Sequence, residues 1–423
     1  MKDFKDTAKD LLAFVKASPS AYHAIHNLAE LLKDYEQLSE QEKWYLKPGG
    51  KYYVVRNDSS LIAFRVPEKK YTALYITAAH SDSPTFRIKP NPQMKAEGCY
   101  TRLNTEKYGG MLMSTWFDRP LSVAGRVIVE EKGKLVSRLV NIDRDLLLIP
   151  SVAIHMNRNS NDGIKYDAQV DTIPLFGGDV KDDCFMGLVA DAAGVKKEAV
   201  LGQDLYLYVR EPGRIWGAFE EFISAGRLDD LQCAFATLSG FLQAGRSTDK
   251  LCVCCVFDNE EVGSLTSQGA DSTFLADVLE RINESLGYTG ETYKRAVRNG
   301  FMISADNAHA VHPSHPELTD PTNKPVLNGG VVMKFNAAQK YGTDGFSEAM
   351  FRSLCEKAKV PCQIYVNRSN MAGGSTLGNI ANRHVSISTV DCGLPQLSMH
   401  SAYETAGVKD TLYMIQVCRE FFS

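Results

Sequence analysis

The chain has 423 residues, of which 44% are hydrophobic and 23% are charged, and its formal net charge is −4. This composition is ordinary for a globular protein that buries a large core without disulfide or metal staples. The small net charge argues against nucleic acid as a partner. No apolar run approaches the roughly 20 residues of a membrane-spanning helix, so a membrane is not an expected partner either.

The N-terminal part of the chain predicts two helices followed by strands. Residues 4–16 and 21–35 carry apolar residues at helical spacing. Residues 51–66 alternate as strands do, and residues 71–79 form a continuous apolar run. Such a run is typical of a central strand that is buried on both faces. We expect this strand to end at His80, where polar residues begin.

The pattern changes from about residue 90 to about residue 220. Short alternating segments, such as 121–130 and 134–142, predict strands that are separated by polar loops rich in Asn and Gly. We therefore predict a β-rich domain at 88–222, inserted into a discontinuous domain that comprises 1–87 and 223–423.

Alternating helices and strands return after the predicted insertion. This order implies an α/β fold in which a mostly parallel central sheet carries helices on both faces. Helices are expected at 228–242, 272–286, 346–359 and 403–421, and strands at 252–257, 300–306, 363–367 and 384–390.

The ten cysteines are scattered through apolar surroundings, and the first residues lack the apolar core of a signal peptide. These features predict a cytoplasmic protein. Cys252 and Cys255 have a spacing that could hold a metal or serve redox chemistry. They lie in a predicted strand, however, where residues three apart point to opposite faces. We therefore interpret them as buried small side chains.

Polar side chains follow three of the predicted buried strands. His80 and Asp82 follow the first, Asp258 to Glu261 follow the second, and Asp306 to His309 follow the third. Ligand sites in open α/β sheets form outside the carboxyl ends of the strands, so these clusters are expected to meet. Two further candidates lie in loops, namely Asp229-Asp230 at a helix start and His400 before the closing helix.

Each candidate also has a plain structural explanation. A histidine at a strand end is more often a structural residue than a ligand. Asp229 or Asp230 could cap a helix. Glu260 and Glu261 could be acidic residues favoured near a helix start. His309 could lie on a surface loop.

The combination points to a centre of two zinc ions. Two ions that share one bridging carboxylate each need one histidine, one private carboxylate and an open position for water. Glu260 and Glu261, if they lie in an extended segment, point in different directions, so one can bind metal while the other reaches the water. Asp82 lies on the same side of the chain as His80 and is expected to accept the imidazole proton that faces away from the metal.

Five blocks of residues that contain these candidates, and a sixth that is rich in glycine, occur in the order in which a known family carries them. The blocks are His80-Ser-Asp-Ser-Pro84, Gly226-Arg-Leu-Asp-Asp-Leu231, Phe257-Asp-Asn-Glu-Glu-Val-Gly-Ser264, Ile303-Ser-Ala-Asp-Asn-Ala-His-Ala-Val-His-Pro313, Gly373-Gly-Ser-Thr-Leu-Gly378 and Met399-His-Ser401. They resemble the M18 family of metallo-aminopeptidases, the aspartyl aminopeptidase family. Ser18-Pro19 and the following helix resemble its N-terminal segment, so the resemblance covers nearly the whole chain.

The resemblance implies a role for each candidate metal ligand. One zinc would be held by His80, Asp229 and Asp306. The other would be held by Asp229, Glu261 and His400, with Asp229 bridging the two ions. Mn²⁺ or Co²⁺ could replace Zn²⁺, because such sites discriminate weakly by affinity.

The resemblance also implies how peptides are bound and cut. Glu260 would be the general base, and His309, Lys334 and Tyr341 match positions that contact substrate in the family. The inserted domain would be a dimerisation domain that lends His155 to the active site of a neighbouring subunit. Members of the family usually form a dodecamer built of dimers.

The expected activity is therefore removal of the N-terminal residue from peptides with a free N-terminus. An acidic first residue needs a cation in the pocket, and Lys334 is the candidate, although a solvated lysine near a strand end is the plain alternative. Some members prefer neutral apolar residues. Asn307 departs from the family, many of whose members carry an apolar residue at that position.

Two other functions are compatible with parts of the pattern. One is a two-zinc deacylase or carboxypeptidase that acts on N-blocked substrates, and the other is a scaffold or cargo protein with a decayed site. The motif blocks argue against the first, and the complete set of ligands and base argues against the second.

Overall fold

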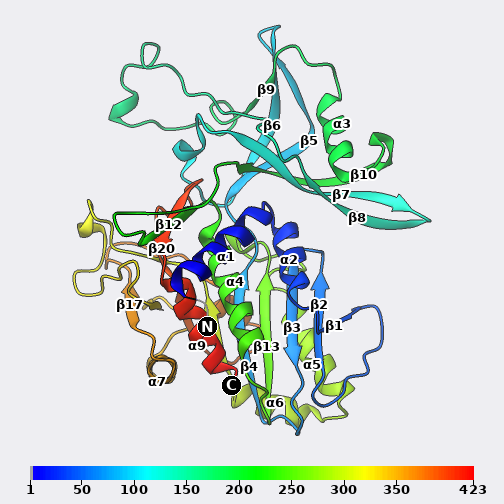
Figure 1. Cartoon of the computed structure of the whole chain (residues 1–423), viewed down its shortest axis with the longest axis vertical. Coiled ribbons are helices and arrows are strands. Elements are labelled where there is room, and N and C mark those ends of the chain that lie inside the picture. The colour runs from blue at the N-terminus through cyan, green and yellow to red at the C-terminus, as the bar shows by residue number, and fades with distance from the viewer. Residues whose placement is uncertain (1–2) are drawn as a thin grey trace. The chain divides into compact units, whose positions relative to one another are not determined.

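The computed structural model describes residues 3–423 and divides them into two compact units (Figure 1). Within the described residues, the first unit comprises residues 3–82, Gly213–Met399 and Glu404–Ser423. The second comprises Ser83–Pro212 and the short segment His400–Tyr403. The sequence boundaries were placed at 88 and 222, and the return of 400–403 to the second unit has no counterpart in the sequence pattern.

The first unit is built on a nine-stranded mixed sheet within the described residues. Its central strands β13, β4, β14 and β18 are all parallel to one another. In spatial order the strands are β1 (Glu36–Leu38), β2 (Lys51–Arg56), β3 (Ser60–Arg65), β13 (Lys250–Phe257), β4 (Ala73–His80), β14 (Phe301–Ala305), β18 (Ser388–Gly393), β16 (Val331–Phe335) and β17 (Cys362–Val366). The predicted α/β class with a central, largely parallel sheet is confirmed.

Helices cover both faces of this sheet, as the alternation of elements predicted. One buried cluster joins alternate strand residues to α1 (Phe4–Ala17), α2 (Ala21–Glu30), α4 (Leu228–Gln243), α7 (Gly345–Ala358) and α9 (Asp410–Phe421). The opposite residues pack against α5 (Phe274–Ser285), α6 (Gly290–Arg298) and α8 (Leu377–Ala381). Figure 1 shows α1, α4 and α9 in front of the central strands and α5 and α6 behind them.

Cys252 and Cys255 confirm the interpretation of their spacing. Cys252 belongs to the cluster on the α4 side of the sheet, and Cys255 belongs to the cluster on the α5 side. Both thiols are fully buried in apolar surroundings, so they cannot share one ion.

A smaller sheet lies within the first unit and carries one candidate residue. Its spatial order is β11 (Arg214–Trp216), β12 (Phe222–Ala225), β20 (Glu404–Gly407), β19 (Pro395–Leu397) and β15 (Ala308–His309). The pairing of β15 with β19 places His309 opposite Gln396.

The second unit contains a six-stranded antiparallel sheet within the part of the chain that is described. Its spatial order is β8 (Lys134–Asn141), β7 (Leu121–Glu131), β10 (Val200–Val209), β5 (Thr85–Ala96), β6 (Tyr100–Tyr108) and β9 (Leu175–Gly177). Helix α3 (Cys184–Ala193), which the sequence patterns did not predict, packs Phe185 and Val189 into the same core as Phe86 and Leu205.

Three sequence-based boundaries were wrong. The helix expected at 21–35 ends at Glu30, and a turn leads from it to strand β1. The strand expected at 384–390 begins only at Ser388, because residues 382–387 form a turn and irregular backbone after α8 ends at Ala381. The closing helix expected from residue 403 begins at Asp410, because residues 404–407 form strand β20. At 404–407, pairing of β20 with the distant strand β12 outweighs local helical propensity.

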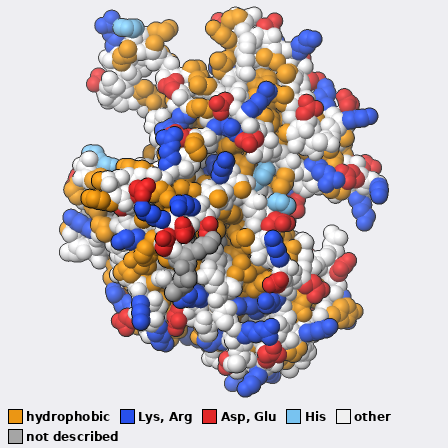
Figure 2. All heavy atoms as spheres, viewed as in Figure 1, with side chains coloured by type: hydrophobic (Ala, Val, Ile, Leu, Met, Phe, Trp, Pro, Cys, Tyr) orange, Lys and Arg blue, Asp and Glu red, His pale blue; other side chains and the backbone are white. Residues whose placement is uncertain are grey.

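None of the described helices combines the length and apolarity needed to cross a lipid bilayer. On the visible face, acidic and basic side chains are interspersed (Figure 2).

Candidate functional site

Three neighbouring strands of the large sheet bring the predicted polar clusters to one edge. Strands β13, β4 and β14 are adjacent and parallel, with Phe257 opposite His80 in the register. Because parallel strands end at the same edge, the residues that follow them emerge together. Asp258 follows β13, and Asp306 follows β14.

The contact predicted between His80 and Asp82 is present. Nδ1 of the His80 ring lies 3.2 Å from Oδ1 of Asp82 and 3.1 Å from the Asp82 carbonyl oxygen. Both side chains are buried. An Nδ1 proton directed at these oxygens leaves Nε2 as the available lone pair, and Nε2 faces Asp229 Oδ1 at 3.4 Å and Asp306 Oδ1 at 3.9 Å.

Asp82 also orients the pair of glutamates. Its two carboxylate oxygens accept the backbone N–H groups of Glu260 and Glu261 at 3.1 and 3.2 Å. The expectation of an extended segment was wrong, because Glu260–Val262 form a short 3-10 helix. Asn259 precedes it with φ 61°, a left-handed turn that asparagine tolerates, and its side-chain oxygen is held by Thr266 and Gln268.

The aspartate pair lies in the irregular first turn of α4. Asp229 and Asp230 have non-helical backbone angles, and no side chain caps this helix. Instead, Oδ2 of Asp230 accepts the backbone N–H of His80 at 3.0 Å. The Asp229 N–H donates to the buried carboxylate of Glu404, also at 3.0 Å. The capping alternative is therefore wrong, and the carboxylates are turned toward the histidine.

Two overlapping groups of possible ligands result within the first unit. One atom from each of His80, Asp229, Asp230 and Asp306 lies within 4.8 Å of every other, and the same is true of His80, Glu260 and Glu261. Tetrahedral ligands at about 2.0–2.2 Å from one zinc lie about 3.3–3.6 Å apart, so small side-chain adjustments would bring such a group onto one ion. The geometry therefore brings together four of the five predicted ligands and the predicted base, and it adds Asp230, to which no role had been assigned.

The electrostatics of this cluster are those of crowded acids. Burial raises the pKa of Glu260 to about 8, His80 opposes this shift, and Asp306, Asp82 and Asp229 add to it. Burial likewise raises the pKa of Glu261, Asp230 and Asp306 above their usual ranges. Burial disfavours the His80 imidazolium, but the surrounding carboxylates outweigh it and raise the pKa of this histidine.

These shifts fit residues whose natural partner is a cation. Protons on carboxylates and imidazole occupy the positions that a divalent ion fills when it binds, and metal binding releases them. Oδ1 of Asp230 is buried and has no hydrogen-bond partner, which costs free energy unless another group compensates it. The donor set of nitrogen and carboxylate oxygen suits Zn²⁺, Mn²⁺ or Co²⁺.

Lys334 is buried, which excludes the solvated lysine considered from sequence. Its Nζ lies 3.3 Å from Oδ2 of Asp306 and 5.7 Å from the centre of the Tyr341 ring. Burial alone disfavours the charged amine, but the Asp306 carboxylate outweighs it and raises the pKa of Lys334. A permanent cation therefore lies beside the acidic cluster.

Tyr341 and His309 line a cavity of about 310 Å³ within the first unit. Tyr341 packs with Tyr365, Ala308 and Val332 in a small buried cluster. The His309 ring lies 5.7 Å from the ring of Tyr365, and its side chain is exposed. His309 and Tyr341, two of the residues expected to contact substrate, therefore line the same cavity.

Asn307 belongs to a buried polar network behind the cluster. Its Nδ2 donates to Oε1 of Gln232 at 2.9 Å and to Oε1 of Gln396 at 2.7 Å. Its Oδ1 accepts the thiol of Cys233 at 3.0 Å. Gln396 in turn donates to Glu404 at 3.4 Å, the same residue that binds the Asp229 N–H. The Asn307 amide thus forms hydrogen bonds with Gln232, Gln396 and Cys233 that an apolar side chain at this position could not form.

Sequence reasoning missed Asp391, which is fully buried. The signal was available, because Asp391 comes close to the end of a buried strand, as Asp306 does. The strand expected at 384–390 places Asp391 directly after its end, whereas the observed strand runs to Gly393 and includes Asp391.

Two predicted site residues lie in the second unit. His155 is exposed in the long loop between β8 and β9. His400 opens the segment that returns to this unit, and its carbonyl accepts the N–H of Leu112 at 3.0 Å. Their approach to a metal site stays a prediction.

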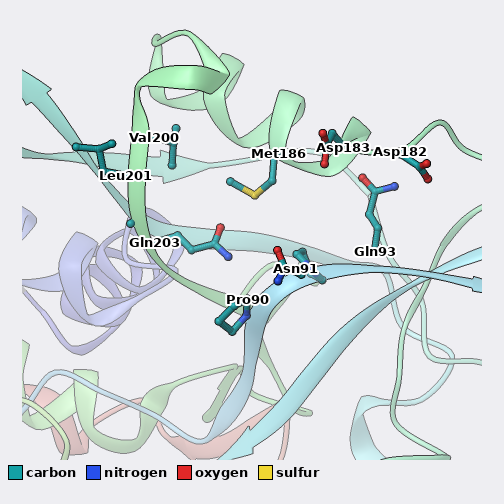
Figure 3. Close-up of a pocket in the computed structure, with 11 residues that line it drawn as sticks. Pro90, Asn91, Gln93, Asp182, Asp183, Met186, Val200, Leu201 and Gln203 are labelled. Carbon is teal, nitrogen blue, oxygen red and sulfur yellow. The ribbon is translucent and has the colours of Figure 1, made fainter.

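The second unit also contains a cavity of about 630 Å³ between α3, β5 and β10. Figure 3 shows Met186, Gln203 and Asn91 around it. Its lining includes Asp182 and Asp183 but no histidine, cysteine or lysine among the described residues. It therefore lacks the donor set found at the edge of the large sheet.

Comparison with known proteins places these features in a family. A family model described as aminopeptidase I zinc metalloprotease (M18) matches residues 14–422. A protein of Clostridium novyi named probable M18 family aminopeptidase 2 is 46% identical over 433 residues, which covers 100% of both chains.

Solved structures show the same similarity. A chain in a cryo-EM structure of an Ape4 and Nbr1 complex is 36% identical with a TM-score of 0.95, over 99% of this chain and 86% of that one. The S. cerevisiae mApe1 dodecamer is 28% identical with a TM-score of 0.85, over 100% and 97% of the two chains.

Proposed function

Because the chain belongs to the aminopeptidase I zinc metalloprotease (M18) family and is a metallo-aminopeptidase, we propose that it releases acidic N-terminal residues from peptides at a two-metal centre. The observation that carries this proposal is the convergence of His80, Asp229, Asp306, Glu260 and Glu261 at the edge of the large sheet.

The proposed ligands form two sets that share Asp229. His80, Asp229 and Asp306 would hold one ion, and Asp229, Glu261 and His400 would hold a second, so Asp229 would belong to both sets. Asp230 supports His80 by accepting its backbone N–H. Bound divalent ions supply Lewis acidity and lower the pKa of a water molecule toward neutrality. His400 is joined directly to Met399, the last residue of its segment in the first unit, which is compatible with this set.

The proposed base is Glu260. Its carboxylate takes the proton of the attacking water and returns it to the leaving amine. Asp82 fixes the backbone of Glu260 and Glu261 with one carboxylate, so that one glutamate serves as ligand and the other as base. The Tyr341 hydroxyl donates to the carbonyl oxygen, where negative charge develops in the transition state.

The acidic preference rests on Lys334. Its charge is buried beside Asp306, and low local polarity strengthens its attraction for a substrate carboxylate. The buried charge of Lys334 repels a cationic first residue of the substrate, whereas it does not repel a neutral one. The expected order of first residues is therefore Asp and Glu, then Leu, then Lys.

The proposed assembly is a dodecamer built of dimers, since a relative with 28% identity is a dodecamer. The loop that carries His155 exposes Val152, Ile154 and Met156 by 58%, 48% and 82%. Exposed apolar side chains clustered in one loop mark an interaction site. We assign the second unit to dimerisation and His155 to the active site of a neighbouring copy.

The free state of all ten cysteines favours a cytoplasmic location.

Initial hydrolysis rates on short peptides test the proposal. Peptides that begin with Asp, Glu, Leu or Lys are each assayed with added Zn²⁺ and with a chelator, alongside their N-acetylated forms. Cleavage led by Asp and Glu and abolished by the chelator is expected. Cleavage led by Leu would keep the mechanism but reject Lys334 as the specificity residue. Cleavage of only the acetylated peptides would indicate a hydrolase for blocked substrates.

A further inference from the structure

Asp391 is a buried carboxylate that the proposed mechanism does not use. It lies on β18, opposite Ser304 of β14 in the parallel register. Its side chain is 0% exposed. A charged group in such a place is costly unless it is hydrogen-bonded, so its partners indicate what it does.

The two oxygens of Asp391 bind two different loops. Oδ1 accepts the hydroxyl of Thr376 at 2.7 Å. Oδ2 accepts the backbone N–H of Gly342, the residue after Tyr341. The backbone of Asp391 adds a second link, because its N–H donates to the hydroxyl of Thr343 at 2.9 Å.

Both loops line the cavity that Tyr341 faces. Tyr341 lines it directly, and Gly374 lines it from the glycine-rich segment that ends at Thr376. A second link joins the same loops, because Ser375 donates to Asn379 at 2.9 Å and Asn379 donates to the Gln339 carbonyl at 3.5 Å. Among the side chains that form these hydrogen bonds, Asp391 carries the carboxylate.

The space around the carboxylate fits an aspartate closely. A Cβ atom on Gly378 would lie 2.7 Å from Oδ1, and one on Gly342 would lie 3.3 Å from Oδ2. The backbone approaches the carboxylate so closely that a longer side chain has no room. The Thr376 hydroxyl holds Oδ1, so the plane of the carboxylate is fixed and Oδ2 stays directed at the Gly342 N–H.

We propose that Asp391 is a positioning residue that holds the Tyr341–Thr343 loop, through the Gly342 N–H, in the place where the Tyr341 hydroxyl reaches the reacting carbonyl. This inference rests on the proposed function of Tyr341. It assigns no contact between Asp391 and substrate or metal.

Two isosteric substitutions test whether Asp391 positions the Tyr341–Thr343 loop. Asp391→Asn keeps the size of the side chain but removes its charge and one acceptor. Thr376→Val removes the hydroxyl that orients the carboxylate, and Thr376→Ser keeps it as the matched control. Because a misplacement of about 1 Å can cost about 100-fold in rate, kcat is expected to fall roughly 10- to 100-fold in Asp391→Asn and less in Thr376→Val. KM, bound zinc and assembly size stay unchanged, and Thr376→Ser retains most of the wild-type rate.

A double-mutant cycle with Tyr341→Phe separates positioning from general stability. If Asp391 acts through the tyrosine hydroxyl, Asp391→Asn costs much less in the Tyr341→Phe background than in the wild type. An equal cost in both backgrounds overturns the inference, as does a Thr376→Ser enzyme as slow as Thr376→Val. If Asp391→Asn fails to fold, the Thr376 pair in both backgrounds decides the question.

The cycle also distinguishes failure of this inference from failure of the proposed function. A Tyr341→Phe enzyme with the wild-type rate removes the proposed role of Tyr341, and the inference falls with it. A slow Tyr341→Phe enzyme with an additive Asp391→Asn loss removes only the inference. A loss confined to Asp and Glu substrates would instead indicate that Asp391 acts through Lys334, and it would equally overturn the assignment to Tyr341.

Discussion

Glu260 and Glu261 are adjacent in sequence and both donate their backbone N–H groups to the Asp82 carboxylate, yet we propose different roles for them. Burial raises the pKa of both side chains. Bound cations stabilise the ionised form of a carboxylate that coordinates them. A glutamate that stays outside the coordination sphere keeps more of its raised pKa, and a base whose pKa lies near the working pH transfers protons efficiently.

Replacing Glu260 with Gln tests this division. The amide keeps the shape of the side chain but cannot take a proton, so kcat is expected to fall at least about 100-fold. Zinc content, measured by elemental analysis of the purified protein, stays at the wild-type level. Glu356→Gln, an exposed substitution on α7, serves as the control. Turnover at the wild-type rate would reject the base assignment, and loss of zinc would make Glu260 a ligand.

Asn307 is expected to matter for stability because its partners are buried. In Asn307→Leu, the Oε1 atoms of Gln232 and Gln396 lose the donor they share. A buried polar group left unsatisfied costs about 1–3 kcal/mol, so the free energy of unfolding is expected to fall by about 3 kcal/mol in total. Thermal unfolding of both proteins at equal concentration measures this. An unchanged midpoint would mean that the network rearranges, and the exposed Asn370→Leu is the control.

At the scale of elements, the chemistry is placed by where strands end. The parallel strands β13, β4 and β14 present their polar clusters at one edge, and α4 adds the aspartate pair from its irregular first turn. Arg227, just before α4, donates to the carbonyls of Val15 and Ser18 at 3.2 Å each. The N-terminal helices therefore brace the element that carries Asp229, which connects their packing to the site.

Helix α2 contains a pH-sensitive residue far from the acidic cluster in sequence. Burial lowers the pKa of His23 to about 4, and the charges of His26 and Arg227 add to the shift. The unfolded chain takes up a proton near pH 6.5, whereas the folded chain resists it down to about 4. The contribution of this residue to stability is therefore complete above pH 6.5 and is lost as the pH falls from 6.5 to 4.

Comparing wild type with His23→Asn across pH measures this contribution. Between pH 7.5 and 4.5 the wild type is expected to lose about 2.5 kcal/mol through His23, and the variant lacks this loss. Metal release at low pH affects both proteins alike, so the difference between their unfolding midpoints isolates the histidine. Parallel curves for the two proteins would contradict the prediction. The exposed His312→Asn should follow the wild-type curve.

At the scale of the whole molecule, our proposal is that another copy of the chain contributes His155 to the site. His155 lies in a loop with exposed apolar neighbours, which suits a segment that a second chain covers. A residue lent between subunits makes activity depend on assembly, and complementation between two inactive variants reveals it.

Co-expression of His155→Ala with Glu260→Gln is the corresponding test. Each variant alone is expected to lose at least about 10-fold in rate. In a mixed dimer, the subunit that carries His155→Ala retains its own Glu260 and receives His155 from its partner, so one site works. Mixed dimers purified through two different tags should therefore recover activity. If His155 acts within its own chain, the mixture stays inactive.

Much of the fold and the donor set was predictable from sequence because it depends on local pattern. The apolar run at 71–79 predicted β4, and its end placed His80 and Asp82 next to each other as observed. The spacing of Cys252 and Cys255 predicted opposite faces of β13. The start of α9 was not predictable, because residues 404–407 pair as strand β20 with the distant strand β12.

The amino-acid sequence by itself determined the α/β class, the family and the identity of the acids and histidines, since periodicity and motif spacing are properties of neighbouring residues. Tertiary structure alone decided that Asp230 joins the cluster, that Lys334 is buried beside Asp306, that Asn307 has polar partners and that Asp391 holds two loops. These features depend on contacts between segments tens to hundreds of residues apart, and on which polar atoms lose water when those segments meet.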